Sequence, residues 1–493
     1  MVDPDTSASG EAPPRSAASG AAAAATTDER AAAPKTAILL IHGMGEQRPM
    51  ATLWGFVDAI WSRDPNLVED YNGEIYAKPD TINDNFELRR VTTRYWKGNP
   101  RRRVDFFEFY WAHMMRGNTI KSTVEWILGL FFRSPSSVPT GLRAVWLAGL
   151  VFLTAAIGLF IAATLPKDLA QALFDKPTLL ILGIVSTLSG LFAARWLAPV
   201  AGDAARYFSP IPDNVEARQK IMRAGVDVIE KLARSGDYDR IIVVGHSLGS
   251  AIGLDILYQA FGRVAPRDWA RVHKRKTVAD ALLALEKAAA KLEASKSETD
   301  LADYRVHQRD YAAALRDGWQ TSEAPWLVSD FVTLGSPLSK ANVLIAHDQT
   351  SFTDLADRRQ IPTCPPKLEQ HKPPRFSFPQ GSVAIPHFAA VFAPSLWTNV
   401  YFPSRLIAFG DIISGPASPL FGPAVRDIRV PVIGLRFRHN DYWRLPALEP
   451  GREASPPPVW IDALRQAVNL RLAPEPGAPV LSAPPQATPR EEA

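Results

Sequence analysis

One serine in the sequence has neighbours suited to nucleophilic chemistry. Residues 245–249 read Gly245-His246-Ser247-Leu248-Gly249, which matches the pattern Gly-x-Ser-x-Gly. A β-branched apolar run precedes the pattern, and an apolar run with helical spacing follows it. We therefore predict a strand, a tight turn and a helix, with Gly245 and Gly249 allowing close packing around the turn. Ser247 Oγ would then lie above the carboxyl end of a strand, where it can attack a carbonyl carbon.

A second glycine-containing motif follows the first predicted strand. The short apolar run 36–41 ends abruptly at His42 and Gly43, as a buried parallel strand would. Together, Ile41-His42-Gly43-Met44-Gly45 and Gly245-His246-Ser247-Leu248-Gly249 resemble the lipase and esterase branch of the α/β-hydrolase superfamily, over residues 36–56 and about 222–470. The resemblance implies an oxyanion hole made by the backbone N–H groups of Met44 and Leu248, while His42 is interpreted as a structural turn residue.

The same resemblance implies a substrate pocket and a chain order of serine, acid, histidine. Gly43, His246 and Ser336 are the residues expected at the pocket, Ser336 because residues 333–338 resemble the loop after the next strand. Pro337 directly follows Ser336 and no strand-turn-helix pattern surrounds it, so we do not predict Ser336 as a nucleophile.

His439 is the predicted base. The histidines downstream of Ser247 are His273, His307, His347, His371, His387 and His439. Only His439 comes just after the last predicted strand, 430–437, where the resemblance places the catalytic histidine on a loop. His387 is the alternative.

Asp411 is the predicted acid. It follows the predicted strand 397–402, in a loop bracketed by Gly410 and Gly415, and resembles the acid of related hydrolases. Its role would be to hold the tautomer of His439 and stabilise its protonated form. Asp427, Asp354 and Asp441 are alternatives, and Asp411 could also serve only to stabilise a turn.

The elements that must position these residues are buried strands separated by helices. Strands are predicted at 36–41, 240–245, 330–335, 397–402 and 430–437, and a closing helix at 460–472. This order predicts an α/β fold, a mostly parallel sheet flanked by helices. With the resemblance, we expect an α/β-hydrolase fold that carries a two-helix transmembrane hairpin and a charged helical insertion.

The hairpin is predicted between the first two of those strands. Spans are expected at about 144–165 and 178–198, because each run is apolar and close to the roughly 20 residues that cross a bilayer. The alternative is a pair of core helices in a large cap domain. Basic residues are more numerous outside the connector than within it, which favours a cytoplasmic catalytic domain. The short apolar run 124–132 is interpreted as an interfacial helix.

The charged insertion spans residues 267–324. It is rich in Ala, Leu, Lys, Glu and Arg, with helical spacing in 279–292 and 301–315. We expect a lid or partner-binding arm, or a solvated spacer. The predicted organisation is a tail (1–34), a first hydrolase part (35–132), the hairpin (133–208), the nucleophile part (209–266), the charged insertion (267–324), a C-terminal hydrolase part (325–470) and a second tail (471–493).

Composition excludes several classes of function. The 493 residues carry 55 basic and 51 acidic side chains, a balance that does not indicate a nucleic-acid partner. The single cysteine, Cys364, excludes an intrachain disulfide and a multi-cysteine metal site, and no cofactor or metal is expected.

The sequence therefore predicts a membrane-anchored serine hydrolase. We expect it to cleave carboxylic esters, in the manner of an esterase or lipase, through an acyl-enzyme. The expected partners are an acyl or ester substrate, lipid among them, and the bilayer of a bacterial-type inner or plasma membrane. The alternatives are a membrane scaffold or partner-binding protein that retains the fold with little turnover, and an acyltransferase.

Overall fold

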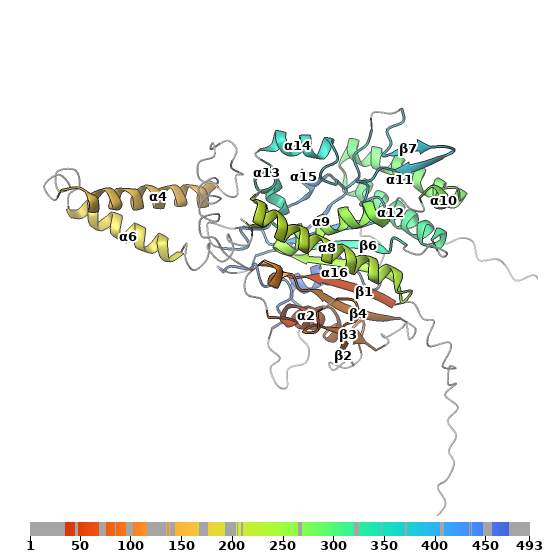
Figure 1. The fold of residues 1–493 in the computed structure, drawn as a ribbon, viewed down its shortest axis with the longest axis horizontal. Helices are drawn as coiled ribbons and strands as arrows, with labels where there is room; N and C mark the ends of the chain where they lie inside the picture. The colour runs from red at the N-terminus through yellow and green to blue at the C-terminus, as the bar shows by residue number, and fades with distance from the viewer. Residues whose placement is uncertain are drawn as a thin grey trace, which may run out of the picture. The chain divides into compact units, whose positions relative to one another are not determined.

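A computed structural model of the chain defines an α/β architecture around one large sheet (Figure 1). The sheet order is β10-β9-β6-β5-β1-β4-β3-β2. The strands are β1 (Lys35–Ile41), β2 (Ile75–Pro79), β3 (Arg89–Thr93), β4 (Arg103–Phe109), β5 (Tyr238–His246), β6 (Val328–Leu334), β9 (Leu396–Tyr401) and β10 (Arg426–Arg429). The structure describes residues 35–44, 48–68, 75–83, 85–94, 102–115, 135, 138, 143–166, 176–192, 204, 206–208, 211–264, 269–319, 325–346, 348–369, 372–404, 409–432, 434, 436–446 and 456–472.

The sheet is mostly parallel, as predicted. Seven of its strands run in one direction, and β3 alone runs against them, so the antiparallel pairs are β2–β3 and β3–β4. In register, Ile41 lies beside Gly245, and Gly245 lies beside Thr333. The carboxyl ends of the central strands therefore meet at one edge, which brings the loops that follow them together.

Helices cover both faces of this sheet. They are α2 (Ala51–Val57), α8 (Pro212–Arg234), α9 (Leu248–Val264), α10 (Trp269–Val272), α11 (Lys276–Ser295), α12 (Glu298–Gly318), α13 (Ala341–Leu344), α14 (Gln349–Asp357), α15 (Ser418–Phe421) and α16 (Val459–Val468). A π-helical turn (Asp58–Ser62) continues α2, and 3-10 turns lie at Ala112–Met114 and Pro337–Lys340. A separate hairpin joins β7 (Ser377–Gln380) and β8 (Val383–Pro386).

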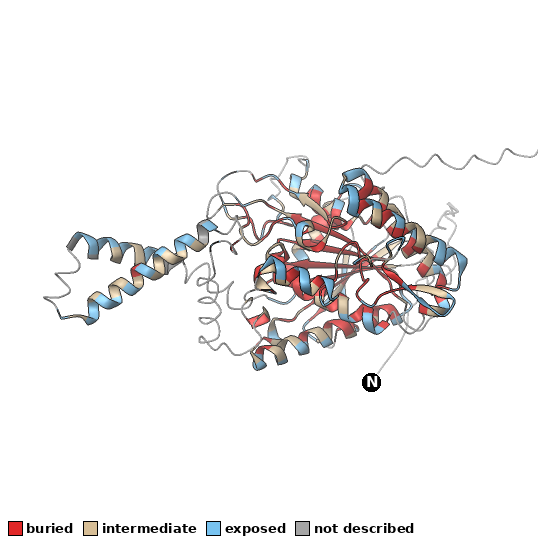
Figure 2. Cartoon of the chain, turned by 90° about the horizontal axis from the view of Figure 1, so that it is seen from above, coloured by how far each residue is buried: buried red, intermediate tan, exposed pale blue. Residues whose placement is uncertain are grey.

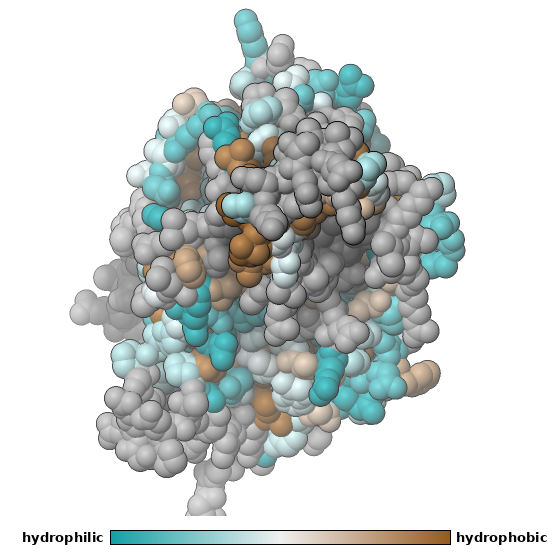
Figure 3. All heavy atoms as spheres, turned by 90° about the vertical axis from the view of Figure 1, so that its left-hand side faces the viewer, coloured by the Kyte–Doolittle hydropathy of each residue, from teal (hydrophilic) through white to brown (hydrophobic). Residues whose placement is uncertain are grey.

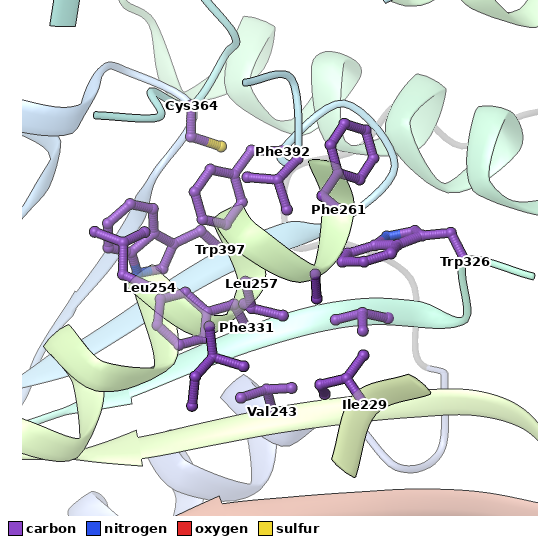
Figure 4. Packing of buried hydrophobic residues seen from close by; sticks show 14 of the residues in the cluster. Ile229, Val243, Leu254, Leu257, Phe261, Trp326, Phe331, Cys364, Phe392 and Trp397 are labelled. Atoms are coloured by element: carbon purple, nitrogen blue, oxygen red, sulfur yellow. The ribbon is translucent and has the colours of Figure 1, made fainter. Parts of the chain in front are cut away.

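Two apolar cores result, one on each face of the sheet. Val243 and Phe331 pack with α9, Phe392 and Trp397 on one face (Figure 4). On the other face, strand residues such as Val244 pack with α2 and α16. Neighbouring strand residues alternate between the two cores because successive side chains of a strand point to opposite faces. Figure 2 shows the strands as buried and the helices exposed on their outer sides.

The α11–α12 pair is part of this packed body. Tyr304 and Tyr311 of α12 are fully buried, and Gln308 donates hydrogen bonds to the backbone oxygens of Phe392 and Ser395. In α11, Glu286 accepts hydrogen bonds from the backbone N–H groups of residues 376 and 377. The solvated-spacer interpretation of the charged insertion therefore does not hold for the residues described.

The helices α4 (Arg143–Thr164) and α6 (Lys176–Phe192) form a pair of a different kind. They lie side by side in Figures 1 and 2, and a Cβ on Gly158 would be 3.6 Å from Leu182 Cδ1. Within the described part of the chain, one helix is long and apolar enough to cross a membrane, at Trp146–Thr164, and almost none of this apolar stretch is buried. Figure 3 shows exposed apolar atoms in the upper half of the face it displays. The predicted second span is described only to Phe192.

The last strand differs from the prediction. The described residues of the run 430–437 are not a strand, although Phe437 forms a single β-bridge with Gly410; β10 is Arg426–Arg429, directly upstream. Pro431 cannot donate to a sheet ladder, and Arg426–Arg429 is an edge strand whose charged residues give no hydrophobic signal. Strands β2, β3 and β4 were also not predicted. The predicted tail 1–34, the predicted interfacial helix 124–132 and residues 473–493 of the predicted second tail lie outside the described residues.

Candidate active site

Ser247 lies at the turn between β5 and α9, as the motif predicts. β5 ends at His246 and α9 begins at Leu248, so one residue makes the turn. Its φ angle is 51°, in the left-handed region that non-glycine residues seldom adopt. Local strain of this kind persists only where the surroundings enforce it, and it is concentrated at functional sites.

The flanking glycines are required by close backbone approach. A Cβ on Gly245 would lie 2.5 Å from Ser250 Cα, and a Cβ on Gly249 would lie 2.3 Å from the carbonyl oxygen of Ile41. A Cβ on Gly43 would lie 2.9 Å from Ser247 Cβ. The loop after β1 therefore packs directly on the Ser247 turn, and no larger residue fits at these three positions without displacement.

The structure brings Ser247, His439 and Asp411 into one hydrogen-bonded chain. His439 Nε2 is 2.9 Å from Ser247 Oγ, and His439 Nδ1 is 2.9 Å from Asp411 Oδ2. Because a carboxylate can only accept, Nδ1 carries the proton and Nε2 is free to accept the serine proton. All three residues are buried, with exposed fractions of 1%, 5% and 0% in the order named.

Asp411 is held in its ionised form. Its Oδ1 accepts from the backbone N–H groups of Ile413 and Ser414, at 3.0 and 3.3 Å. Burial by itself raises the pKa of this carboxyl, but the charge of His439 and the hydrogen bonds from His439, Tyr442 and Ser414 outweigh it and lower the pKa. A buried carboxylate of this kind can stabilise a protonated imidazole.

Tyr442 is a member of this network that the sequence did not reveal. Its hydroxyl donates to Asp411 Oδ2 at 2.8 Å, the same oxygen that faces His439. The tyrosine is buried and also accepts a hydrogen bond from the backbone N–H of Phe402. Gly335 packs over the network, because a Cβ there would lie 2.8 Å from Tyr442 and 3.2 Å from His439 Nδ1. The only available signal was that Tyr442 lies three residues after His439.

His246 and His42 support the site without joining the chain. His246 Nε2 is 2.9 Å from the backbone oxygen of His439 and therefore donates to it, which holds the loop in place. His42 Nε2 accepts from the backbone N–H of Trp111, so Nδ1 donates to the oxygen of Gly43. Burial lowers the pKa of His246 to about 3 and that of His42 to about 4, so both are neutral at pH 7.

Of the predicted oxyanion donors, Leu248 directly follows Ser247, and Met44 follows Gly43, which packs on the Ser247 turn. Leu248 is the first residue of α9, and an N–H in the first turn of a helix has no acceptor within the helix. Met44 is in the loop after β1 and packs, partly buried, against the core that contains Val243 and Phe331. The positive end of the α9 dipole adds to the stabilisation of negative charge at this point.

The other residues considered for the pocket, the base and the acid contact other partners or lie outside the described residues. Ser336 is buried and shares a hydrogen bond of 2.6 Å with Ser250, so it lies behind the Ser247 turn. His387 is 3.3 Å from the oxygen of Lys367. Asp427 accepts from Asn399, and Asp441 pairs with Arg438 at 3.1 Å. His347 and His371 lie outside the described residues.

Nothing among the described residues forms a group of three or more His, Cys, Asp or Glu side chains that could hold a metal ion. The groups that the described residues bring together at this site are the hydroxyl of Ser247, the imidazole of His439 and the carboxylate of Asp411. In comparisons with known proteins, no family model matches the sequence, and no significant match is found to a curated protein or a solved structure.

Proposed function

We propose that the protein is a serine hydrolase of α/β-hydrolase fold that cleaves carboxylic esters at Ser247. The observation that carries the proposal is the continuous chain from Asp411 through His439 to Ser247, with both contacts at 2.9 Å. A nucleophile, a base and an orienting acid in mutual contact are the arrangement that activates a serine hydroxyl.

The reaction would proceed in two halves. His439 Nε2 takes the proton of Ser247 as Oγ attacks the carbonyl carbon, and Asp411 stabilises the imidazolium that forms. The imidazolium then gives this proton to the leaving alcohol, which departs as the acyl-enzyme forms. In the second half His439 takes a proton from water, the hydroxide oxygen attacks the acyl carbon, and the proton returns to Ser247 Oγ. The N–H groups of Leu248 and Met44 would stabilise both tetrahedral oxyanions.

We further propose that α4 and α6 are the two spans of a membrane hairpin and that the catalytic domain is cytoplasmic. The support is the exposed apolar surface of the pair, for example Phe160 at 71% and Leu180 at 65%. A helix that is apolar on all sides is stable when its surroundings are apolar too. The anchor would keep the site near acyl lipids, which favours lipid-like esters as substrates.

Labelling with a fluorophosphonate probe tests the proposed activity. Wild-type protein is compared with Ser247→Ala, and with Ser351→Ala as a matched control whose side chain lies outside the site. We expect labelling of wild type and Ser351→Ala but not of Ser247→Ala. Since Ser247 is 1% exposed, the reaction should be run in both detergent micelles and lipid nanodiscs. Absence of labelling of folded wild type in both would refute the proposal and favour the scaffold function.

Cysteine accessibility tests the membrane arrangement. Cys364 is fully buried, and burial raises the pKa of its thiol to about 12, so it gives little background. Asp168→Cys in the connector and Asp310→Cys on α12 are reacted with a membrane-impermeant maleimide in intact cells. We expect labelling at position 168 only. Labelling at 310 only would reverse the orientation, and labelling at neither position until the membrane is opened would contradict the spanning hairpin.

A further inference from the structure

A second region of the molecule has the chemistry of a binding site. A cavity of about 490 Å³ lies between α12, α16 and the strands β9 and β10. Its charged lining consists of five arginines, Arg305, Arg309, Arg426, Arg465 and Arg471, and two aspartates, Asp64 and Asp462. Five positive charges against two negative ones leave an excess of three. Such a lining attracts anions.

This cavity is separate from the candidate active site. Thr398, which lines it, is the third residue of β9, and Arg426 is the first residue of β10. Ser247 follows the carboxyl end of β5, and the strands run parallel. The cavity therefore opens toward the amino ends of the strands, and neither Ser247, Asp411 nor His439 lines it.

Hydrogen bonds to protein oxygens hold two of the five guanidinium groups, those of Arg305 and Arg465, in place. Arg305 donates to the oxygen of Trp397 and to Thr398 Oγ1, both at 3.0 Å. Arg465 donates to the oxygens of Ala59 and Arg63, at 3.0 and 2.6 Å. Arg309 lies four residues after Arg305, on the same side of α12. Ordering long side chains before binding lowers the entropy cost of binding a ligand.

Arginine is also the residue type that recognises oxyanions best. The planar guanidinium presents paired N–H donors that match a phosphate or carboxylate. The cavity lining contains no lysine or glutamate, and amides from Asn66, Gln466 and Asn469 add further polar groups. We propose that this cavity binds an oxyanion, either a phosphate-bearing small molecule or carboxylates of the chain's own residues 473–493. Those residues include Glu475, Glu491 and Glu492, and they follow directly after Arg471 and Leu472.

Binding of inorganic pyrophosphate to the full-length protein tests this proposal. Calorimetric titration at constant ionic strength should give saturable binding in wild type. Arg309→Gln and the exposed Arg471→Gln should each raise the dissociation constant about tenfold or more, since a charge-assisted contact is lost. Arg263→Gln, a matched control on α9 that lies outside the cavity, should leave it unchanged.

A variant in which Glu475, Glu491 and Glu492 are all glutamine distinguishes the two sources. Equal affinity in this variant and wild type identifies a free oxyanion as the ligand. Binding that is at least tenfold tighter in the variant identifies the chain's own carboxylates as the occupant. The proposal is overturned if pyrophosphate binds neither protein, or if binding is insensitive to Arg309→Gln and Arg471→Gln. None of these readouts depends on hydrolase activity.

Discussion

The two ends of the sheet hold buried polar groups of opposite character. At the carboxyl end, Asp411, His439 and Ser247 form a hydrogen-bonded chain in which a proton can pass between the serine hydroxyl and the imidazole. At the amino end, Arg240 Nη2 and Asp330 Oδ2 form a buried ion pair of 2.6 Å, with 1% and 4% of the side chains exposed. Arginine does not release its proton in proteins, so this pair has fixed charges. The comparison separates groups that would act from groups that hold the fold.

The largest expected effect is on catalysis. Asp411→Asn should lower kcat for a chromogenic ester by about 10⁴-fold, because the imidazole would lose its orienting carboxylate. The unfolding temperature should change little, since an amide oxygen can still accept from the N–H groups of Ile413 and Ser414. An unchanged kcat would remove Asp411 from the catalytic chain.

The reverse pattern is expected at the amino end. Arg240→Met should lower the free energy of unfolding by about 3–5 kcal/mol, because Asp330 would stay buried without its ion-pair partner. The double variant Arg240→Met/Asp330→Leu should recover much of that stability in denaturant unfolding. Ester hydrolysis by the folded fraction should be unchanged in both variants. A loss of kcat in the folded fraction of either variant would mean that the Arg240–Asp330 pair also affects catalysis, and the distinction between the two ends would not hold.

Acid sensitivity should arise at the carboxyl end. Burial lowers the pKa of His42 to about 4, below the value of about 6.5 for an unfolded histidine. The unfolded chain therefore binds the proton first, so stability is full above pH 6.5 and falls as the pH drops toward 4. Protonation of His42 alone should lower the free energy of unfolding by about 3 kcal/mol between these two pH values.

Denaturant unfolding at pH 7 and pH 4.5 would show the contribution of His42 as a shallower pH dependence in His42→Gln. The Arg240–Asp330 pair should not contribute in this window. The pKa of Asp330 is lowered because attraction from Arg240 and Arg309 and hydrogen bonds from Ser329 and Arg240 outweigh burial, so the carboxyl protonates only at lower pH. If stability depended on pH as steeply in His42→Gln as in wild type, His42 would not be a source of the acid sensitivity.

The smallest expected effect concerns Tyr442. Tyr442→Phe removes one hydrogen bond to the Asp411 carboxylate and should lower kcat roughly tenfold. KM should stay the same if the hydroxyl positions the acid rather than touching the substrate. The acidic limb of the pH–rate profile should also move to higher pH, since one group that stabilises ionised Asp411 is lost. A change in KM alone would assign Tyr442 to substrate binding.

Sequence reasoning predicted what depends on local pattern. The Ser247 turn could be predicted because its strand, its glycines and its helix are contiguous, and the structure shows this strand-turn-helix arrangement. His439 and Asp411 lie where they were expected relative to Ser247, although the expected last strand was wrong. Chain order only limited the candidates to residues after Ser247. His439 was selected because it directly follows the run 430–437, which still leads into its loop although the described residues of that run are not a strand. Asp411 was selected because it follows the predicted strand 397–402, which corresponds to β9.

What could not be predicted depends on tertiary contact. One example is the burial of Glu108, which lies in β4 next to Leu40. Because β4 is buried on both faces, its sequence shows no alternation of polar and apolar residues from which this burial could be predicted. Tyr442 could not be recognised because its role arises only when the loop after Phe437 folds back onto Asp411. The buried pair of Arg240 and Asp330 joins residues 90 positions apart. Burial of such charges is rare, so composition offers no signal for it.

The position of β5 in the sheet has a consequence for biosynthesis. β1 pairs with β5, yet more than 190 residues separate Ile41 from Tyr238, and α4 and α6 lie between them. At about 5–20 residues per second, the ribosome needs on the order of 10–40 s to make this stretch. The proposed membrane spans are thus synthesised before β5. Insertion into the bilayer would precede closure of the sheet, and the Ser247 turn would form only on a chain that is already anchored.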